Sequence, residues 1–245
     1  MISGNRKGDT ANNVFLPSGR TITVGGALSN ETPIGVSMAV PGTFTAGGSF
    51  TEDAPASTYF ASDVSGFAVW QSEGQGALAV AAVEAGGATT CCAGFDRAVT
   101  AWNSAPDGAN LRLLADVTIN DTIKPSGTKT LDLNGYGIRC TNNTTVIGIE
   151  RAVDLTLADS NPGRTHYITL ENGRGTGVSD TEPDGSTAHI QVSGGYITGG
   201  DNYNGGGVYV VDGVFTMTGG TICGNTAIYG GGVYFGSTVF ILFFL

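Results

Sequence analysis

Two aspartates have a spacing that could support acid–base chemistry on a sugar. Asp132 lies between Leu131 and Leu133, and Asp154 precedes the similar run that begins at Leu155. On neighbouring strands at one position, two carboxylates lie about 5–9 Å apart, the separation that glycoside hydrolases use. Both residues also suit the commoner role of solvated, outward-facing side chains. We therefore expect no catalytic site and keep Asp132 and Asp154 as the candidates to test.

A polysaccharide lyase would need acidic calcium ligands and a basic residue gathered on one outer face. The charged residues that we expect to face outward are instead scattered over several segments: Asp132, Arg139, Glu150, Arg151, Asp154, Asp159, Arg164 and Asp212. Such scatter does not provide the preorganised charges on which catalysis depends. The sequence leans against an enzyme.

Metal ligands and cofactor motifs are equally sparse. Asp180, Glu182 and Asp184 alternate in one polar segment and could hold a cation loosely, although a solvated loop explains them more simply. His166 and His189 have no matched partner in the sequence. The cysteines lack zinc-site spacing, so we expect free thiols at Cys91, Cys92, Cys140 and Cys223. We expect no metal and no cofactor.

Aromatic and hydroxyl side chains offer a binding surface instead. Tyr209 and Tyr234 stand 25 residues apart in equivalent contexts, and Thr216 and Thr218 alternate with apolar residues on the next segment. Stacked tyrosines could bind sugar rings, but such ladders also simply stabilise a sheet. We name these four residues as candidate ligand-binding residues.

The elements that carry these residues repeat with a fixed period of 25. Gly194–Gly199 aligns with Gly219–Gly224, and Gly205–Val210 aligns with Gly230–Phe235, with no insertion or deletion between them. A constant period of this length is typical of a solenoid, in which each coil stacks on the next.

Within one period, apolar residues alternate with polar ones over three to five positions and glycines interrupt the runs. This two-residue periodicity predicts short strands, and a helical repeat would not tolerate three consecutive glycines. Three strands per coil form a parallel β-helix, an all-β fold, with its apolar residues stacked in columns. The expected columns are Ile197 over Ile222, Val208 over Val233, Val210 over Phe235 and Val192 over Met217.

The repeats resemble a known class of protein. The sequence Gly-Gly-Thr-Ile-Cys-Gly-Asn-Thr-Ala at 219–227, followed by Gly-Gly-Gly-Val-Tyr, is similar to repeats of large bacterial cell-surface proteins of the pectin-lyase-like, right-handed β-helix class. The resemblance covers 105–240 and extends to 1–85. It implies an adhesin-like chain with several arrays, and it is specific for fold rather than for function.

Composition limits the partners. The net charge is −10 and the isoelectric point is near 4.4, which argues against nucleic acid and anionic membranes because both require clustered Lys and Arg. No secretory signal is present in 1–13, and the apolar run 239–245 is too short to span a bilayer. For this class we expect a fragment that is cut through coils at both ends and that is extracellular or cell-surface in the full-length protein.

The chain divides into three parts. Residues 1–85 read as the C-terminal part of one array, closed by a hairpin near 67–83. Residues 86–104 read as a linker and a short capping helix, with Phe95 and Trp102 on one helix face. Residues 105–245 read as the truncated start of a second array, with a protruding loop at 173–188.

We expect a non-catalytic structural or adhesive segment that contacts cell-surface or host glycans. One alternative is a β-helical polysaccharide lyase or glycoside hydrolase, which a charged column on one face would favour. The other is a carbohydrate-binding module, which the tyrosine ladder would favour. The sequence leaves the oligomeric state open.

Overall fold

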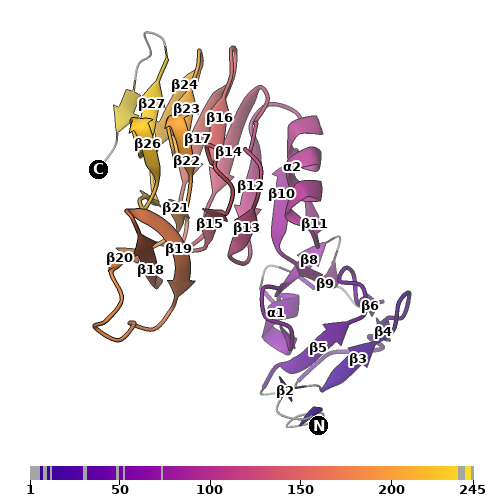
Figure 1. Cartoon of the computed structure of the whole chain (residues 1–245). Coiled ribbons are helices and arrows are strands. Elements are labelled where there is room, and N and C mark those ends of the chain that lie inside the picture. The colour runs from indigo at the N-terminus through magenta and orange to yellow at the C-terminus, as the bar shows by residue number, and fades with distance from the viewer. Residues whose placement is uncertain are drawn as a thin grey trace. The chain divides into compact units, whose positions relative to one another are not determined.

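The structure is a computed structural model that describes residues 6–7, 10–11, 13–29, 32–47, 50–51, 53–72, 74–236 and 241–243. The chain is mostly β, with two helices among the described residues. It divides into two compact units, Met1–Ala98 and Val99–Leu245 (Figure 1). The sequence predicts that the chain begins in the middle of a coil, at residues 2–5. These residues lie outside the described part of the chain.

The first unit combines short parallel ladders with antiparallel hairpins. One ladder contains β3 (Val14–Leu16), β5 (Ile34–Met38) and β7 (Phe60–Ser62), and a second pairs β4 (Ile22–Thr23) with β6 (Thr45–Ala46). The antiparallel pairs are β1 (Arg6–Lys7) with β2 (Thr10–Ala11), β8 (Ala68–Ser72) with β9 (Gln75–Ala79), and β10 (Ala81–Ala85) with β11 (Ala88–Cys92). The β8–β9 pair confirms the predicted hairpin.

Aromatic residues form much of the core of this unit. Phe44 is fully buried and contacts Phe60 edge-on at 5.2 Å between ring centroids, and Phe50 lies 6.2 Å from Phe60. The short helix α1 (Ala56–Tyr59) packs its buried Ala56 into the same cluster. The segment predicted as a linker from residue 86 begins with regular structure, because Gly86 and Gly87 take positive φ and turn the chain into β11, which pairs with β10.

The second unit contains three parallel ladders and a fourth short one. The first contains β12 (Ala109–Leu113), β14 (Thr128–Asp132), β17 (Asp154–Ala158), β24 (Val214–Met217) and β28 (Ile241–Phe243). The second contains β13 (Val117–Ile119), β15 (Gly137–Cys140), β21 (Tyr196–Thr198) and β25 (Thr221–Ile222). The third contains β16 (Ile147–Ile149), β23 (Val208–Val210) and β27 (Val233–Phe235), and the fourth pairs β22 (Asp201–Asn204) with β26 (Thr226–Tyr229).

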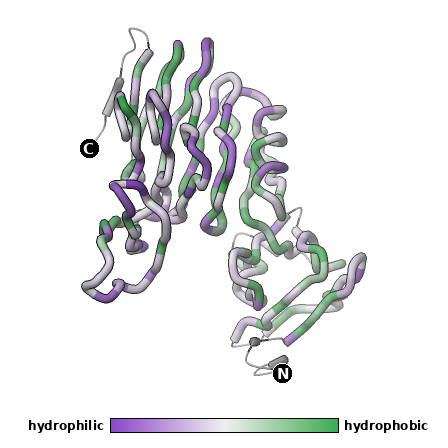
Figure 2. Tube along the Cα trace, viewed as in Figure 1, coloured by the Kyte–Doolittle hydropathy of each residue, from purple (hydrophilic) through white to green (hydrophobic). Residues whose placement is uncertain are grey.

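The chain visits these ladders in turn, and we call each passage from one strand of the first ladder to the next a circuit. Because neighbouring strands belong to successive circuits, equivalent residues stack in columns. Ile197 pairs with Ile222, Val208 with Val233 and Val210 with Phe235, as predicted. Apolar and hydrophilic residues alternate along the strands in Figure 2.

One circuit carries an antiparallel insert that the 25-residue period did not predict. It consists of β18 (Thr165–Glu171), β19 (Arg174–Ser179) and β20 (His189–Ser193), with β18 in the middle, and it protrudes from the stack in Figure 1. The predicted column of Val192 over Met217 is wrong, since Val192 pairs with His166 and Met217 pairs with Leu157. The loop predicted at 173–188 is partly strand and is irregular after β19.

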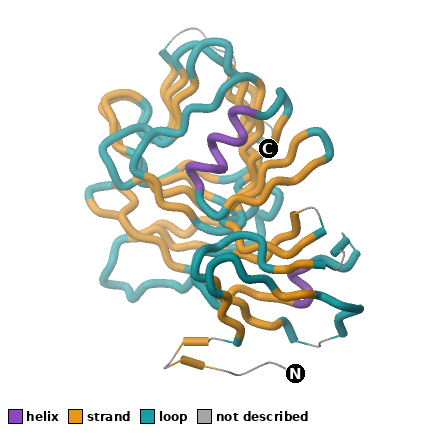
Figure 3. Tube along the Cα trace, turned by 90° about the vertical axis from the view of Figure 1, so that its right-hand side faces the viewer, coloured by secondary structure: helices purple, strands orange, loops and turns teal. Residues whose placement is uncertain are grey.

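Helix α2 (Phe95–Ser104) confirms the helix expected from the spacing of Phe95 and Trp102 (Figure 3). The Trp102 side chain is fully buried, and its Nε1 donates to the Ala109 carbonyl oxygen at 3.0 Å. Asn103 Nδ2 donates to the Lys124 carbonyl oxygen, one circuit further on. The C-terminal half of α2 is thereby held against the first segments of the second unit.

In the apolar run at the end of the chain, the described strand β28 pairs with β24. Phe215 pairs with Ile241, one residue beyond the alignment of Phe215 with Phe240 that the period predicted. Residues 237–240 and 244–245 lie outside the described residues.

Candidate functional site

Four tyrosines from two successive circuits lie together, and we call Tyr203, Tyr209, Tyr229 and Tyr234 the tyrosine patch. Tyr209 and Tyr234 pair across β23 and β27 with ring centroids 5.6 Å apart, which confirms the predicted ladder. Tyr203 of β22 lies 5.5 Å from Tyr229 of β26, and Tyr229 lies 6.4 Å from Tyr234. The four rings therefore form one connected aromatic surface.

Glycine corners position these rings. Gly205 and Gly230 have φ of +61° and +63°, a left-handed conformation that suits glycine. A Cβ at Gly205 would lie 2.9 Å from the Cβ of Tyr209, and one at Gly230 would lie 2.9 Å from that of Tyr234. The repeated glycines thus let the chain turn tightly between the strand pair β22–β26 and the strand pair β23–β27.

The patch is accessible on one side. Tyr203 is 60% exposed and Tyr229 is 52% exposed, while Tyr209 and Tyr234 are half-buried. Ile228, 67% exposed, precedes Tyr229 on the same strand. Large exposed apolar side chains that cluster in this way are typical of an interaction surface.

The predicted threonines do not belong to this surface. Thr216 lies on β24 in the first ladder, where it pairs with Thr156, and Thr218 follows that strand. The Thr218 hydroxyl donates to the Leu157 carbonyl oxygen at 3.2 Å. Tyr209 and Tyr234 lie in the third ladder, so the candidate residues divide between two sheets. Tyr203 and Tyr229 were not among the ligand-binding residues predicted from the sequence, although their 26-residue separation almost matches the 25-residue repeat.

The paired-carboxylate arrangement predicted for Asp132 and Asp154 is wrong. Asp154 pairs with Thr128, at the opposite end of β14 from Asp132, because the register between these circuits is 26 residues rather than 22. Four positions along a strand correspond to about 13 Å, too far for a two-carboxylate mechanism.

Asp132 has a structural role instead. It is 4% exposed, and its Oδ2 accepts hydrogen bonds from Arg112 Nε at 3.1 Å and from the Ser160 hydroxyl at 2.7 Å. Its Oδ1 accepts from the backbone N–H groups of Asn134 and Ser160. A carboxylate with every oxygen occupied by donors from the protein is a corner cap rather than a general base.

The acidic segment after β19 does not form the predicted cation loop. Asp184 binds the hydroxyl and backbone N–H of Ser186, which lower the pKa of its carboxyl group. Asp180 instead lies beside His166, with its Oδ1 2.7 Å from His166 Nδ1. Glu182 is exposed between them. The three acids therefore share no site.

Asp180 and His166 belong to a group completed by Asp116. One ligand atom from each of the three lies within 4.8 Å of the others. His166 is fully buried. The expectation that His166 lacks a partner is wrong, and the missed signal is the Asn172–Gly173 pair, a strong hairpin turn sequence with φ of 52° and 81°. That turn brings β19 back along β18 and places Asp180 opposite His166.

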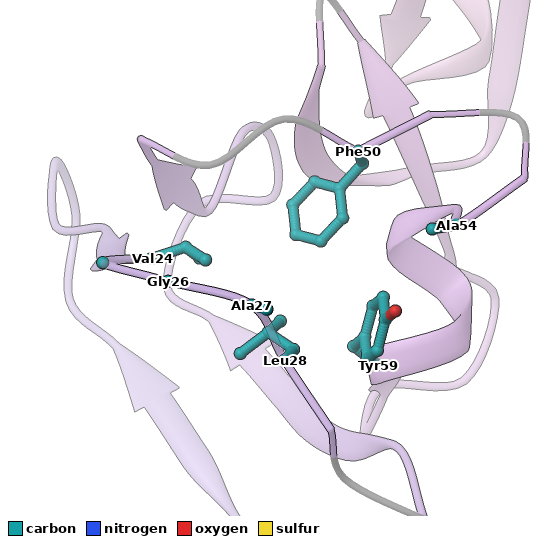
Figure 4. A pocket seen from close by; sticks show the side chains of 8 residues that line it. Val24, Gly26, Ala27, Leu28, Phe50, Ala54 and Tyr59 are labelled. Carbon is teal, nitrogen blue, oxygen red and sulfur yellow. The ribbon is translucent and has the colours of Figure 1, made fainter.

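The first unit contains an apolar pocket lined by Val24, Gly25, Gly26, Ala27, Leu28, Phe50, Ala54 and Tyr59 (Figure 4). The Tyr59 hydroxyl is the one polar side-chain group among these residues. Val24, Leu28 and Tyr59 also pack against the core of this unit. The pocket therefore offers no pair of acid and base groups.

The four cysteines, all within the described residues, form no disulfide. Burial raises the pKa of Cys92, and it raises the pKa of Cys223 to about 11. Both thiols are therefore weak nucleophiles at neutral pH. Free thiols were expected.

Comparison with models of protein families, with curated proteins and with solved structures gives no match for this chain. Within the described part of the chain, neither helix has the length and apolar character needed to cross a membrane.

Proposed function

We propose that the second unit is a right-handed parallel β-helix of the pectin-lyase-like class, from an extracellular bacterial surface protein. In this proposal it acts as a non-catalytic, rigid scaffold that presents the tyrosine patch to glycans. The parallel ladders of the second unit support the fold, because each pairs equivalent residues of successive circuits. The cell-surface assignment rests on the resemblance of the repeats at 194–235.

The tyrosine patch is the observation that carries the glycan proposal. Its rings are spaced 5.5 to 6.4 Å apart and two of them are more than half exposed. Aromatic faces bind the apolar faces of sugar rings, and the phenol hydroxyls can bind sugar hydroxyls at the edge. Because the chain has a net charge of −10, neutral glycans suit it better than uronic acid polymers.

The enzyme alternative receives less support. A hydrolase would require the Asp132 and Asp154 carboxylates to be neighbours, and Asp132 is enclosed by donors from the protein. The second alternative, a carbohydrate-binding module, would use the same tyrosine patch. It differs from the scaffold proposal in the role of the rest of the full-length chain.

Binding to a panel of neutral oligosaccharides, measured by calorimetry, tests the proposal. Tyr203→Ala and Tyr229→Ala should each weaken the Kd about five- to tenfold, since each removes one stacking face. Thr216→Ala, on the first ladder, and Phe15→Ala, which removes an exposed aromatic side chain of the first unit, are the matched controls. The proposal is wrong if no glycan of the panel binds, or if the controls weaken binding as much as the tyrosine variants.

A further inference from the structure

His166, Asp180 and Asp116 meet where the insert lies against the stacked circuits. His166 is the second residue of β18 and pairs with Val192 of β20, Asp180 directly follows β19, and Asp116 directly precedes β13. Two separate parts of the second unit thus contribute donor atoms to one place. A bound ion there would connect the insert to the stack.

The hydrogen bonds of the His166 ring determine what its Nδ1 presents. Nε2 lies 2.9 Å from the Gly135 carbonyl oxygen, which can only accept, so Nε2 carries a hydrogen. In the neutral ring, Nδ1 then carries a lone pair that faces the Asp180 carboxylate, whose Oδ1 lies 2.7 Å from Nδ1. Two electron pairs at that distance require a cation between them, either a proton or a metal ion. A histidine whose second nitrogen donates to a backbone carbonyl is the usual arrangement in metal sites.

Both carboxylates are also oriented by outer contacts. The Gly137 backbone N–H donates to Asp116 Oδ1 at 2.7 Å, and Arg164 Nη2 donates to Asp180 Oδ2 at 3.1 Å. Asp180 Oδ1 is left facing the histidine. Tyr196, which is 1% exposed, forms a side-chain hydrogen bond with Asp116 and contacts the His166 ring edge-on, with 5.0 Å between the ring centroids.

We propose that Asp116, His166 and Asp180 bind a zinc-class divalent cation. Zinc takes nitrogen and carboxylate ligands at about 2.0–2.2 Å in a tetrahedron, which holds neighbouring donor atoms about 3.3 Å apart. The present 2.7 Å between His166 Nδ1 and Asp180 Oδ1 would widen by about half an ångström, and Asp180 is on an exposed loop that can supply this movement.

The donor set also argues for the metal class. An imidazole nitrogen suits zinc and related transition ions, whereas calcium takes six to eight oxygen ligands. With three protein ligands, water completes the tetrahedron on the side of the surface hollow lined by Thr118, Arg139 and Ser179. The bound ion pins the insert to the first circuits.

Titration of the ¹⁵N-labelled protein with zinc chloride tests the site, because the chain has two histidines and their ring signals can be assigned with His189→Gln. The Nδ1 resonance of His166 should shift while His189 stays unchanged. Calorimetry should show Asp116→Asn and Asp180→Asn weakening the zinc Kd at least tenfold. Both substitutions keep the size of the side chain and an acceptor oxygen, so the fold should survive.

Glu182→Gln is the matched control, since it removes a carboxylate two residues from Asp180 and should leave the zinc Kd unchanged. Calcium chloride at the same concentration should not displace zinc. The proposal is overturned if the His166 ring signals do not respond, if both asparagine variants bind zinc as tightly as the parent through other groups such as the cysteines, or if calcium competes.

Discussion

Asp159 connects two successive circuits and both ends of the insert. Its Oδ1 accepts a hydrogen bond from the Gly135 N–H of the previous circuit, and its Oδ2 accepts one from the Gly195 N–H beyond the insert, each at 2.7 Å. Together with Asp132, it shows how acidic residues in this chain satisfy backbone donors at corners that no ladder covers. Asp132, one of the two catalytic candidates, and Asp159 are therefore part of the scaffold.

Cys223 supports a prediction about pH. Its folded pKa is about 11, raised by burial from an ordinary 9.0. The folded state therefore favours the protonated thiol, and this contribution to stability is complete below about pH 9 and is lost as pH rises through about 11. At pH 8.5, iodoacetamide should alkylate Cys223 at least tenfold more slowly in the folded protein than in urea, by peptide mass spectrometry. Equal rates would show that the thiol is not buried as described.

Phe215 and Thr216 are neighbours on β24 with opposite roles. Phe215 is 1% exposed and pairs with Leu155 in the apolar column, while Thr216 is half-buried and pairs with Thr156. Phe215→Ala should lower the free energy of unfolding by about 3–5 kcal/mol, and Thr216→Ala by within about 0.5 kcal/mol. Denaturant midpoints of the two variants check this, and similar losses in both would contradict the assignment of inward and outward faces.

At the scale of elements, the insert marks the limit of what the sequence could predict. Ile190 and Val192 alternate as a coil strand would, but they pair antiparallel to β18. Because parallel and antiparallel strands share a two-residue period, alternation identifies a strand and not its partner. The repeated segments 196–198 and 221–222 were predictable because they combine alternation with a fixed period, which specifies the partner too.

The same argument applies to the candidate sites. The Tyr209–Tyr234 ladder could be predicted from the repeat, since both positions recur after 25 residues. The group around His166 could not be predicted in the same way, because Asp116 comes from outside the insert and long-range contacts leave no local pattern. The Asn172–Gly173 turn could have predicted the contact between Asp180 and His166, because a hairpin there folds Asp180 back onto His166.

The insert is dispensable for the circuits in our account. Joining Asp159 directly to Gly194 gives a connection from β17 to β21 that is as long as the one from β24 to β25, three residues in each case. Removal of 160–193 should therefore leave a β circular dichroism spectrum and a cooperative thermal transition. The midpoint should fall, because Tyr196 loses its contacts with Ile168 and Val192. Loss of β structure would show instead that the insert is required for folding.

At the scale of the whole molecule, the arrangement favours display over chemistry. Asp132 and Asp159 act as corner caps, whereas Tyr203 and Tyr229 on the circuits of 201–235 are more than half exposed. Rate enhancement depends on charged groups preorganised around a reacting bond, and the predicted pair does not provide them.

We therefore expect no cleavage of polysaccharides. Incubation with pectin, alginate and glycosaminoglycans, with and without calcium, should give no rise in ultraviolet absorbance from unsaturated ends, and neutral glucans should give no new reducing ends. Turnover that disappears in Asp132→Asn or Asp154→Asn, with the fold retained, would contradict the scaffold account and support an enzyme.

The tyrosine patch itself provides the most direct test. The measurement is two-dimensional NMR of the tyrosine rings during titration with a neutral oligosaccharide that binds. We predict that the ring signals of Tyr203 and Tyr229 shift most, and that Tyr59 of the first unit and Tyr167 of the insert stay in place. Ring signals of Tyr203 and Tyr229 that stay in place, while those of Tyr59 or Tyr167 shift, would contradict the account.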